Sequence, residues 1–169
     1  MLPVLLVVAA VAGVFLAGCN TQGCTENHSA LPLAQFCSSA TGEGVTLDSL
    51  QIHGVGAPGD STLLAPGTAA EKVYLPMRAS QPETTWCIAY KWKALDFPQL
   101  NDTVAFSYEA IPFLADDECG AMYNYRVTDV DHTSHLIDSV KVTEPVITNA
   151  NGISIKIYFR VDAGEGDGQ

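Results

Sequence analysis

Short apolar segments separated by turn residues follow one another from residue 31 to residue 161, and apolar and polar positions alternate within them. The clearest example is residues 153–159, whose odd positions hold three isoleucines and a phenylalanine and whose even positions hold Ser, Lys and Tyr. This alternation is typical of a half-buried strand, and the Asn-Gly pair before it is a strong hairpin signal. Because no segment shows a helical period, the pattern predicts an all-β fold.

The same pattern predicts further strands at 31–37, 45–55, 61–65, 73–77, 84–92, 102–108 with a continuation at 111–115, 121–127 and 136–142. Within 45–55 the apolar parity reverses between Leu47 and Leu50, which predicts a β-bulge near Asp48 and Ser49. The short strands and their Gly, Pro and Asn turns favour one β-sandwich over residues 31–161, of immunoglobulin-like or transthyretin-like type. A small closed β-barrel is the alternative, and the acidic tail, 162–169, is expected to be disordered.

The segment 84–92 is the strongest strand candidate because large side chains occupy alternate positions, namely Trp86, Ile88, Tyr90 and Trp92. A row of aromatic rings on one face of a strand can stack against sugars. Rows at strand spacing are more often part of a hydrophobic core, which is the interpretation we favour here.

The first residues differ from the rest, because Leu2 to Ala17 form an uncharged apolar run that leads into Gly18-Cys19. Small residues before a cysteine are typical of a lipoprotein signal, which predicts cleavage after residue 18 and lipidation of Cys19. A transmembrane helix is the alternative, but it normally needs about 20 apolar residues. Residues 19–30 would then form a tether between the lipid in the membrane and the folded domain.

Charge limits the choice of partner. The chain has 8 Lys and Arg residues against 19 Asp and Glu residues, all of them after Cys19, which gives a net charge of −11. Phosphates would repel such a domain, so we expect no nucleic acid partner. For the same reason, lipid rather than basic residues would hold the protein to a membrane.

Four cysteines follow Cys19, namely Cys24, Cys37, Cys87 and Cys119. An even number of cysteines in an exported protein favours two disulfides, for which three connectivities are possible. A zinc site is the alternative, but it normally shows closely paired cysteines, whereas the spacings here are 13, 50 and 32 residues.

One polar cluster has the composition of a metal site. Asp129, Asp131, His132 and His135 offer carboxylate and imidazole ligands for a divalent metal. The alternative is an ordinary polar loop between two strands. The acidic run 116–118 could similarly bind calcium, although an exposed acidic turn is the simpler interpretation.

Catalytic motifs find little support in the sequence. The glycine-rich segment 54–60 lacks the Lys-Ser/Thr ending of a phosphate-binding loop and is interpreted as a turn. The chain has no Gly-x-Ser-x-Gly nucleophile motif, and disulfides would leave no free thiol for catalysis. A catalytic pair of carboxylates remains an open alternative, because many acidic residues are present.

Several short motifs together resemble a known family. They are the lipobox at Cys19, Cys24-Thr25-Glu26 just after it, Cys119-Gly120, and the closing segment 155–159. In this combination the chain resembles a family of short Bacteroidetes lipoproteins of unknown function. The resemblance implies an exported β-domain with a disulfide between Cys24 and Cys119, which would leave Cys37 to pair with Cys87.

The resemblance has two further implications. Bacteroidetes lipoproteins bound for the cell surface tend to carry acidic residues after the lipidated cysteine, whereas residues 20–23 are uncharged, which implies an outer-membrane protein that faces the periplasm. The phylum also glycosylates exported proteins at Asp followed by Ser or Thr and an apolar residue. Four segments resemble that pattern, beginning at Asp48, Asp60, Asp102 and Asp138, and Ser61 is the best candidate because it lies near a predicted turn.

The sequence therefore favours a lipid-anchored envelope protein whose β-domain binds or scaffolds an envelope protein or glycan without catalysing a reaction. A glycan-binding or glycan-processing accessory protein is the second hypothesis, carried by Trp86 and Trp92. A metal-binding envelope protein is the third. No cofactor is expected apart from the divalent metal of that third hypothesis.

Overall fold

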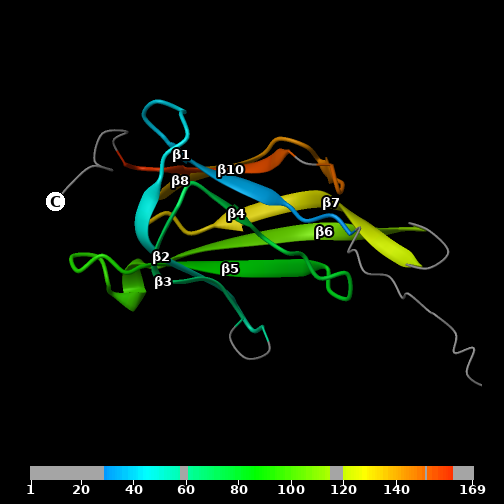
Figure 1. Ribbon diagram of the computed structural model, residues 1–169, viewed down its shortest axis with the longest axis horizontal. Coiled ribbons are helices and arrows are strands. Elements are labelled where there is room, and N and C mark those ends of the chain that lie inside the picture. The colour runs from blue at the N-terminus through cyan, green and yellow to red at the C-terminus, as the bar shows by residue number, and fades with distance from the viewer. Residues whose placement is uncertain (1–28, 58–60, 115–119, 151, 162–169) are drawn as a thin grey trace, which may run out of the picture.

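Two β-sheets packed face to face form the part of the chain that the computed structural model describes, residues 29–57, 61–114, 120–150 and 152–161 (Figure 1). The small sheet has the order β4 (Lys72–Tyr74), β1 (Leu33–Ser38), β10 (Ile153–Phe159), β8 (Ile137–Val142). The large sheet has the order β3 (Thr62–Ala70), β2 (Leu47–Gly54), β5 (Glu83–Tyr90), β6 (Asp102–Leu114), β7 (Ala121–His132), β9 (Val146–Ile147). One turn of 3₁₀ helix, η1 (Pro98–Leu100), lies between β5 and β6. The predicted all-β sandwich is confirmed, and the described strands form two open sheets rather than a closed barrel.

In the small sheet the first strand pairs with the final one. β1 and β10 run parallel, with Phe36 opposite Ile157, and β8 completes the other side of β10 in antiparallel orientation. The observed bounds of β10 agree with the predicted strand 153–159. Ile155, Ile157 and Phe159 are buried against the other sheet, as the alternation predicted, whereas Ile153 is only partly buried and precedes a shift in the register with β1.

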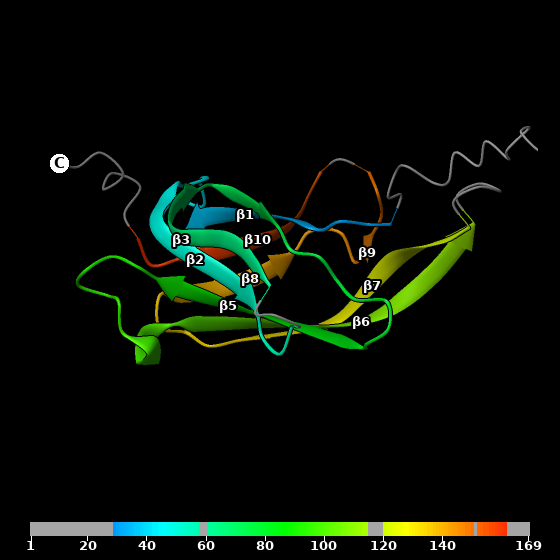
Figure 2. The ribbon, with the colours of Figure 1, turned by 60° about the horizontal axis from the view of Figure 1, so that its bottom comes forward.

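The β6–β7 hairpin is longer than the sequence suggested, and it extends beyond the sandwich as a curved two-stranded arm (Figure 2). β6 continues through Pro112, as predicted, whereas β7 extends to His132 instead of ending near Val127. The pairing of β6 with β5 ends at Ser107, so one side of residues 109–114 has no neighbouring strand. Proline, which has no N–H to donate, is tolerated on such an edge.

At the β3 edge of the large sheet, one prediction about β2 is confirmed and one about β3 is wrong. The bulge predicted near Asp48 and Ser49 is confirmed, because the β2–β3 register shifts between Leu47 and Leu50 and Ser49 has a φ of 54°. The end predicted for the strand at 61–65 is wrong, since β3 runs on through Pro66 and Gly67, which has a φ of 81°. As an edge strand, β3 tolerates both the proline and the irregular register. The strand expected at 73–77 is reduced to β4, and β9 was not predicted.

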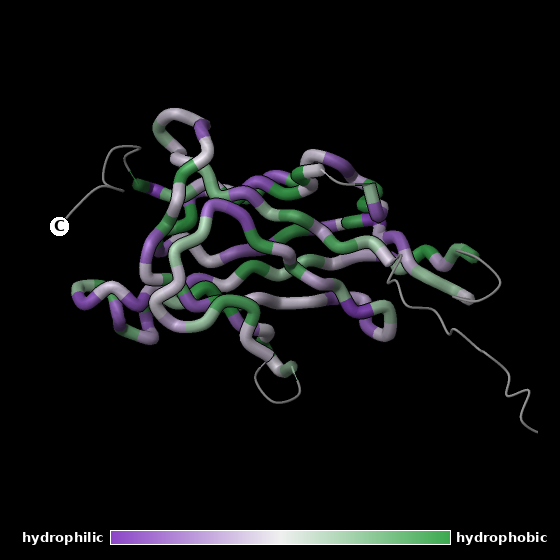
Figure 3. The backbone as a smooth tube through the Cα atoms, in the orientation of Figure 1, coloured by the Kyte–Doolittle hydropathy of each residue, from purple (hydrophilic) through white to green (hydrophobic). Residues whose placement is uncertain are grey.

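The core lies between the sheets and takes alternate residues from each strand, as the hydropathy along the backbone shows (Figure 3). Phe36 and Phe159 meet edge to face across β1 and β10, with ring centroids 5.4 Å apart. The predicted aromatic row is mostly core, because Trp86, like the other two large side chains of β5, is buried. β5 ends before Trp92, which lies in the following loop with 62% of its surface exposed.

The predicted signal peptide (1–18), Cys19 and most of the tether lie outside the described residues, as does the tail 162–169. Ser29 and Ala30, which the sequence assigned to the tether, are attached to β7: the Ala30 N–H donates to the Tyr123 carbonyl at 2.7 Å. Within the described ranges, no helix has the length and hydrophobicity needed to cross a membrane.

Candidate functional site

Among the described residues, the side chain with the most hydrogen bonds is that of Asp102, at the start of β6. It is fully buried, and its carboxylate accepts five hydrogen bonds. Two come from hydroxyl groups, Tyr90 Oη at 2.7 Å and Thr133 Oγ1 at 2.8 Å. Three come from consecutive backbone N–H groups of residues 135–137, at 2.8 to 3.0 Å. Asp102 therefore fastens the crossover from β7 to β8, where the chain passes from one sheet to the other.

The electrostatics of Asp102 also indicate a structural role. Burial is the largest single influence on its carboxyl and by itself would raise the pKa, but hydrogen bonds from Tyr90, Thr133 and the backbone at residues 135 and 136 hold the pKa below its ordinary value. Burial, followed by the adjacent carboxylate, raises the pKa of Tyr90, so the phenol keeps its proton and remains a donor. All donors are internal and the carboxylate is closed to solvent, so a ligand has no access to it.

A second buried hydroxyl cluster fixes the segment between β4 and β5. The Tyr108 hydroxyl accepts from the Arg78 N–H at 2.8 Å and donates to the Arg78 carbonyl at 3.0 Å. Thr84 Oγ1 lies 2.6 Å from the same hydroxyl, and the Tyr125 hydroxyl donates to the Met77 carbonyl at 3.1 Å. The two tyrosine rings pack edge to face, 5.2 Å apart. The buried Tyr108 hydroxyl thus fixes the position of the Arg78 backbone.

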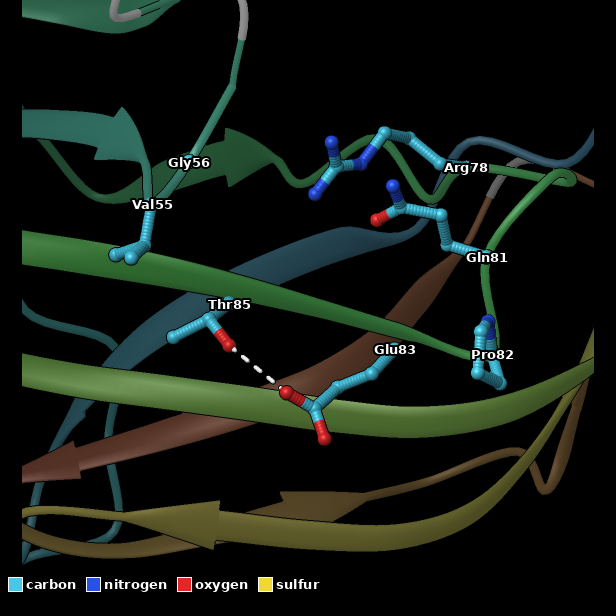
Figure 4. Close-up of a pocket in the computed structure, with 7 residues that line it drawn as sticks. All are labelled: Val55, Gly56, Arg78, Gln81, Pro82, Glu83 and Thr85. Atoms are coloured by element: carbon cyan, nitrogen blue, oxygen red, sulfur yellow. Dashed lines mark hydrogen bonds between the residues drawn. The ribbon is translucent and has the colours of Figure 1, made fainter.

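Arg78 also lines a hollow of about 380 Å³ beside the start of β5 (Figure 4). It is lined by Val55 and Gly56 after β2, by Arg78, Gln81 and Pro82 before β5, and by Glu83 and Thr85 on β5. The side chains of Arg78 and Gln81 extend from the same segment into this space. The hollow is the candidate functional site.

The Arg78 guanidinium has no hydrogen-bond or ion-pair partner among the described residues. None of the ion pairs or side-chain hydrogen bonds among the described residues uses it, although the chain carries a net charge of −11. The carboxylate of the hollow, Glu83, accepts a hydrogen bond from the Thr85 hydroxyl at 3.3 Å. The hollow therefore offers three polar groups: the unpaired guanidinium of Arg78, the Glu83 carboxylate and the Gln81 amide. This combination suits a polar ligand that carries a negatively charged group.

The predicted disulfide between Cys37 and Cys87 is wrong, because both thiols are free and buried. Cys37 lies on β1 and Cys87 on β5, in different sheets. On both strands the neighbouring residues, such as Phe36 and Trp86, point into the core, so each cysteine lies on the outer face of its own sheet. Sheets pack about 10 Å apart, which is too far for a bridge between outer faces. Cys24 and Cys119 lie outside the described residues, and their pairing stays a prediction.

These positions predict a pattern of thiol reactivity. In the folded protein Cys37 and Cys87 should resist iodoacetamide, because burial closes access and raises the pKa of each thiol. After unfolding in urea without reductant, both should be alkylated, as peptide mass spectrometry would show. A reduced sample is the control. If either peptide remains unlabelled until reductant is added, that cysteine is oxidised in the native protein and the structural assignment fails.

The predicted metal ligands do not come together. Asp129, Asp131 and His132 belong to the end of β7 rather than to a loop, and strand alternation places the two carboxylates on the face opposite the imidazole. The His132 ring bonds the Thr133 carbonyl at 2.8 Å, while the backbone of His135 is committed to Asp102. Over the whole described part of the chain, no group of three potential ligands is close enough to hold a metal ion.

The other sites considered from the sequence are the glycosylation-like segments, the acidic run 116–118 and the glycine-rich segment 54–60. Ser61 is exposed just before β3, and its glycosylation stays a prediction. Asp102, the first residue of another segment that resembles the glycosylation pattern, accepts internal hydrogen bonds with its carboxylate. The acidic run 116–118 lies outside the described residues. In the glycine-rich segment 54–60, residues 55 and 56 form a turn after β2, as predicted, and contribute to the hollow, whereas residues 58–60 lie outside the described residues.

Comparison with known families gives one match. The model of DUF6452, a family of unknown function, matches residues 49–159, well over half of the chain. The chain belongs to this family. All residues that line the hollow, together with Asp102 and Tyr108, fall inside the DUF6452 region, whereas β1 precedes it. No curated protein and no solved structure matches the chain. The match to DUF6452 brings no activity with it, and the lipoprotein and Bacteroidetes origin inferred from the sequence stay predictions.

Proposed function

We propose that this DUF6452 protein is a lipid-anchored, non-enzymatic domain of the cell envelope that binds an envelope component in the hollow at Arg78. The observation that carries the proposal is the unpartnered guanidinium on a backbone fixed by Tyr108. Ordering the long side chain of Arg78 costs conformational entropy, and an ion pair with a carboxylate of the same chain would offset that cost. No such pair forms among the described residues. An arginine that stays free in a highly acidic protein is available to a ligand.

The anchor is the part of the proposal that rests on the sequence. Lipidation of Cys19 would hold the domain to a membrane, in the proposed case the outer membrane on its periplasmic side. Ser29 and Ala30 are bound along β7, so the chain leaves the fold at the β6–β7 arm. Residues 19–28 would then connect this end of the sandwich to the lipid.

Replacement of Cys19 by serine tests the anchor. The wild-type protein should incorporate labelled palmitate and stay with the membrane fraction, whereas Cys19→Ser should carry no label and leave that fraction, because acyl chains supply the membrane affinity. Cys37→Ser is the control, since Cys37 is buried in the sandwich. Equal membrane association of Cys19→Ser and wild type, with no label in either, would refute the anchor.

Binding of a glycan is the second candidate function, and one observation favours it. The loop after β5 exposes Trp92 by 62% and Phe97 by 48%, and it is held by an ion pair of 2.9 Å between Lys91 and Asp96. Exposed aromatic rings stack against sugar faces. Trp86 cannot take part because it is buried, so a shift of Trp92 fluorescence on addition of oligosaccharides, lost in Trp92→Ala, is the deciding measurement.

A further inference from the structure

We propose that the hollow recognises a polypeptide by its terminal carboxylate, with Arg78 as the carboxylate receptor and the start of β5 as the strand edge against which the peptide lies. This inference rests on the proposed function, since it names the ligand class of the same hollow. Four features of the described residues carry it: the free cation, the open strand edge, the charge balance and the lining.

The first feature is the preorganised cation. The Tyr108 hydroxyl binds both the N–H and the carbonyl of Arg78, so the base of the arginine is fixed while its guanidinium stays unpaired. A guanidinium offers parallel N–H donors that match the two oxygens of a carboxylate. Gln81 extends into the same space and adds an amide that can donate or accept.

The second feature is an open strand edge. The register between β2 and β5 ends at Gly54 opposite Trp86, followed by one further bond from the Val55 N–H to the Thr85 carbonyl at 2.9 Å. Beyond that bond β2 turns away at Gly56, which has a φ of 65°, so the β5 backbone before Thr85 has no strand on that side. A short extended peptide can extend a sheet at such an edge through main-chain hydrogen bonds.

The third feature is the charge balance of the hollow. Arg78 and Glu83 contribute one charge of each sign, so a ligand with a single negative charge can bind the guanidinium without a large excess of negative charge nearby. A phosphate group, with up to two negative charges, would be repelled by the Glu83 carboxylate. That carboxylate can instead accept an N–H from the peptide backbone.

The fourth feature is the lining. Val55 is 45% exposed and Pro82 lies on the other side of the hollow, so a small apolar side chain of the last peptide residue would find nonpolar contacts. None of the described lining residues is aromatic, and sugar rings generally bind against aromatic faces. A peptide carboxylate therefore fits the hollow better than an acidic sugar does.

The test is calorimetric titration of the full-length protein, purified in a mild detergent, with matched small probes. The first probe is acetyl-Gly-Gly-Val with a free carboxyl group, and the second is the same peptide with a carboxyl-terminal amide. Acetate and glucuronate report on a carboxylate without a peptide. The free-acid peptide should bind with a Kd below about 1 mM, and the amide and both small acids about tenfold or more weakly.

Three variants locate the binding site. Arg78→Gln should weaken binding of the free-acid peptide about tenfold or more without changing the melting temperature, because Tyr108 holds only the arginine backbone. Arg78→Lys should recover part of the affinity, since lysine keeps the charge but not the paired donors. Arg126→Gln is the matched control, because Arg126 pairs with Glu109 on the exposed surface of the β6–β7 hairpin.

The outcomes separate the two proposals. Equal affinity for acid and amide, or no saturation up to about 10 mM peptide, overturns carboxylate recognition. Binding of glucuronate as tight as that of the peptide, with the same dependence on Arg78, overturns the peptide part. If these titrations fail while the native protein captures an envelope component that Arg78→Gln loses, only the ligand class is wrong and the proposed function stands. If no such Arg78-dependent capture exists either, the proposed function fails as well.

Discussion

Asp102→Ala is expected to lower the free energy of unfolding by about 4 kcal/mol, because it removes the central acceptor of a buried polar network. The substitution removes the acceptor of five hydrogen bonds. Two hydroxyl groups and three backbone N–H groups would then lose their acceptor, and the bonds from Tyr90 and Ile137 are buried. Each buried donor without an acceptor costs about 1–3 kcal/mol, although water entering the cavity would recover part of the loss.

Urea unfolding followed by circular dichroism measures this effect, and Asp138→Ala is the matched control. Asp138 is exposed and forms a single ion pair with Arg160 at 3.3 Å, so its removal should change the free energy of unfolding by less than about 1 kcal/mol. Similar losses in the two variants would show that the Asp102 network does not hold the β7–β8 crossover.

The same carboxylate makes stability depend on pH. The folded pKa of Asp102 lies below its ordinary value, so the folded state favours the charged form. Its contribution to stability is complete above the unfolded pKa of about 4 and is lost as the pH falls through the lower folded pKa. Asp102→Asn lacks this titration, so the stability difference between wild type and Asp102→Asn should shrink as the solution is acidified below about pH 4.

Phe159→Ala is expected to cost about 4 kcal/mol through loss of packing rather than of hydrogen bonds. Phe159 is fully buried at the end of β10, and its ring meets Phe36 of β1 edge to face. Truncation would leave a cavity between the two central strands of the small sheet. Tyr158→Ala is the control, because this neighbouring aromatic residue faces outward and is only partly buried.

The comparison is made by urea denaturation, with Tyr158→Ala expected to lose about 1 kcal/mol. A larger loss for Tyr158→Ala than for Phe159→Ala would mean that the two faces of β10 are assigned the wrong way round. It would also contradict the register of β1 with β10, in which Ser38 lies opposite Phe159.

Much of the sandwich is predictable from alternation, because a strand with one buried face leaves a period of two in its sequence. β10 and the reversal of parity around Ser49 are examples. Edge strands are less predictable, since unpaired backbone tolerates residues such as Pro66 that normally end a strand. The cysteines show another limit: an even count suggests pairing, but only the three-dimensional structure shows that Cys37 and Cys87 lie on opposite outer faces.

The candidate site was not predictable from the sequence. Arg78 and Tyr108 are 30 residues apart and belong to no motif, and their relation arises only from two bonds between a hydroxyl and a backbone. The role of Asp102 was not predictable either, because the sequence marked it only as the first residue of a segment that resembles a glycosylation pattern, whereas its carboxylate is fully buried. The predicted metal site at residues 129–135 is not formed, because β7 continues to His132 and strand alternation separates the two carboxylates from the imidazole of that residue.

The parallel pairing of β1 with β10 has a consequence for biosynthesis. During translation β1 emerges before the other described strands, while its main neighbour is the last of them to emerge. Until then the partners of β1 among the described residues are β4, over three residue positions, and Gly44, through an isolated bridge to Cys37. A nascent chain must therefore carry an incomplete, apolar small sheet until synthesis is almost finished, and a polypeptide that stops short of Ile153 would keep that surface open to chaperones and proteases.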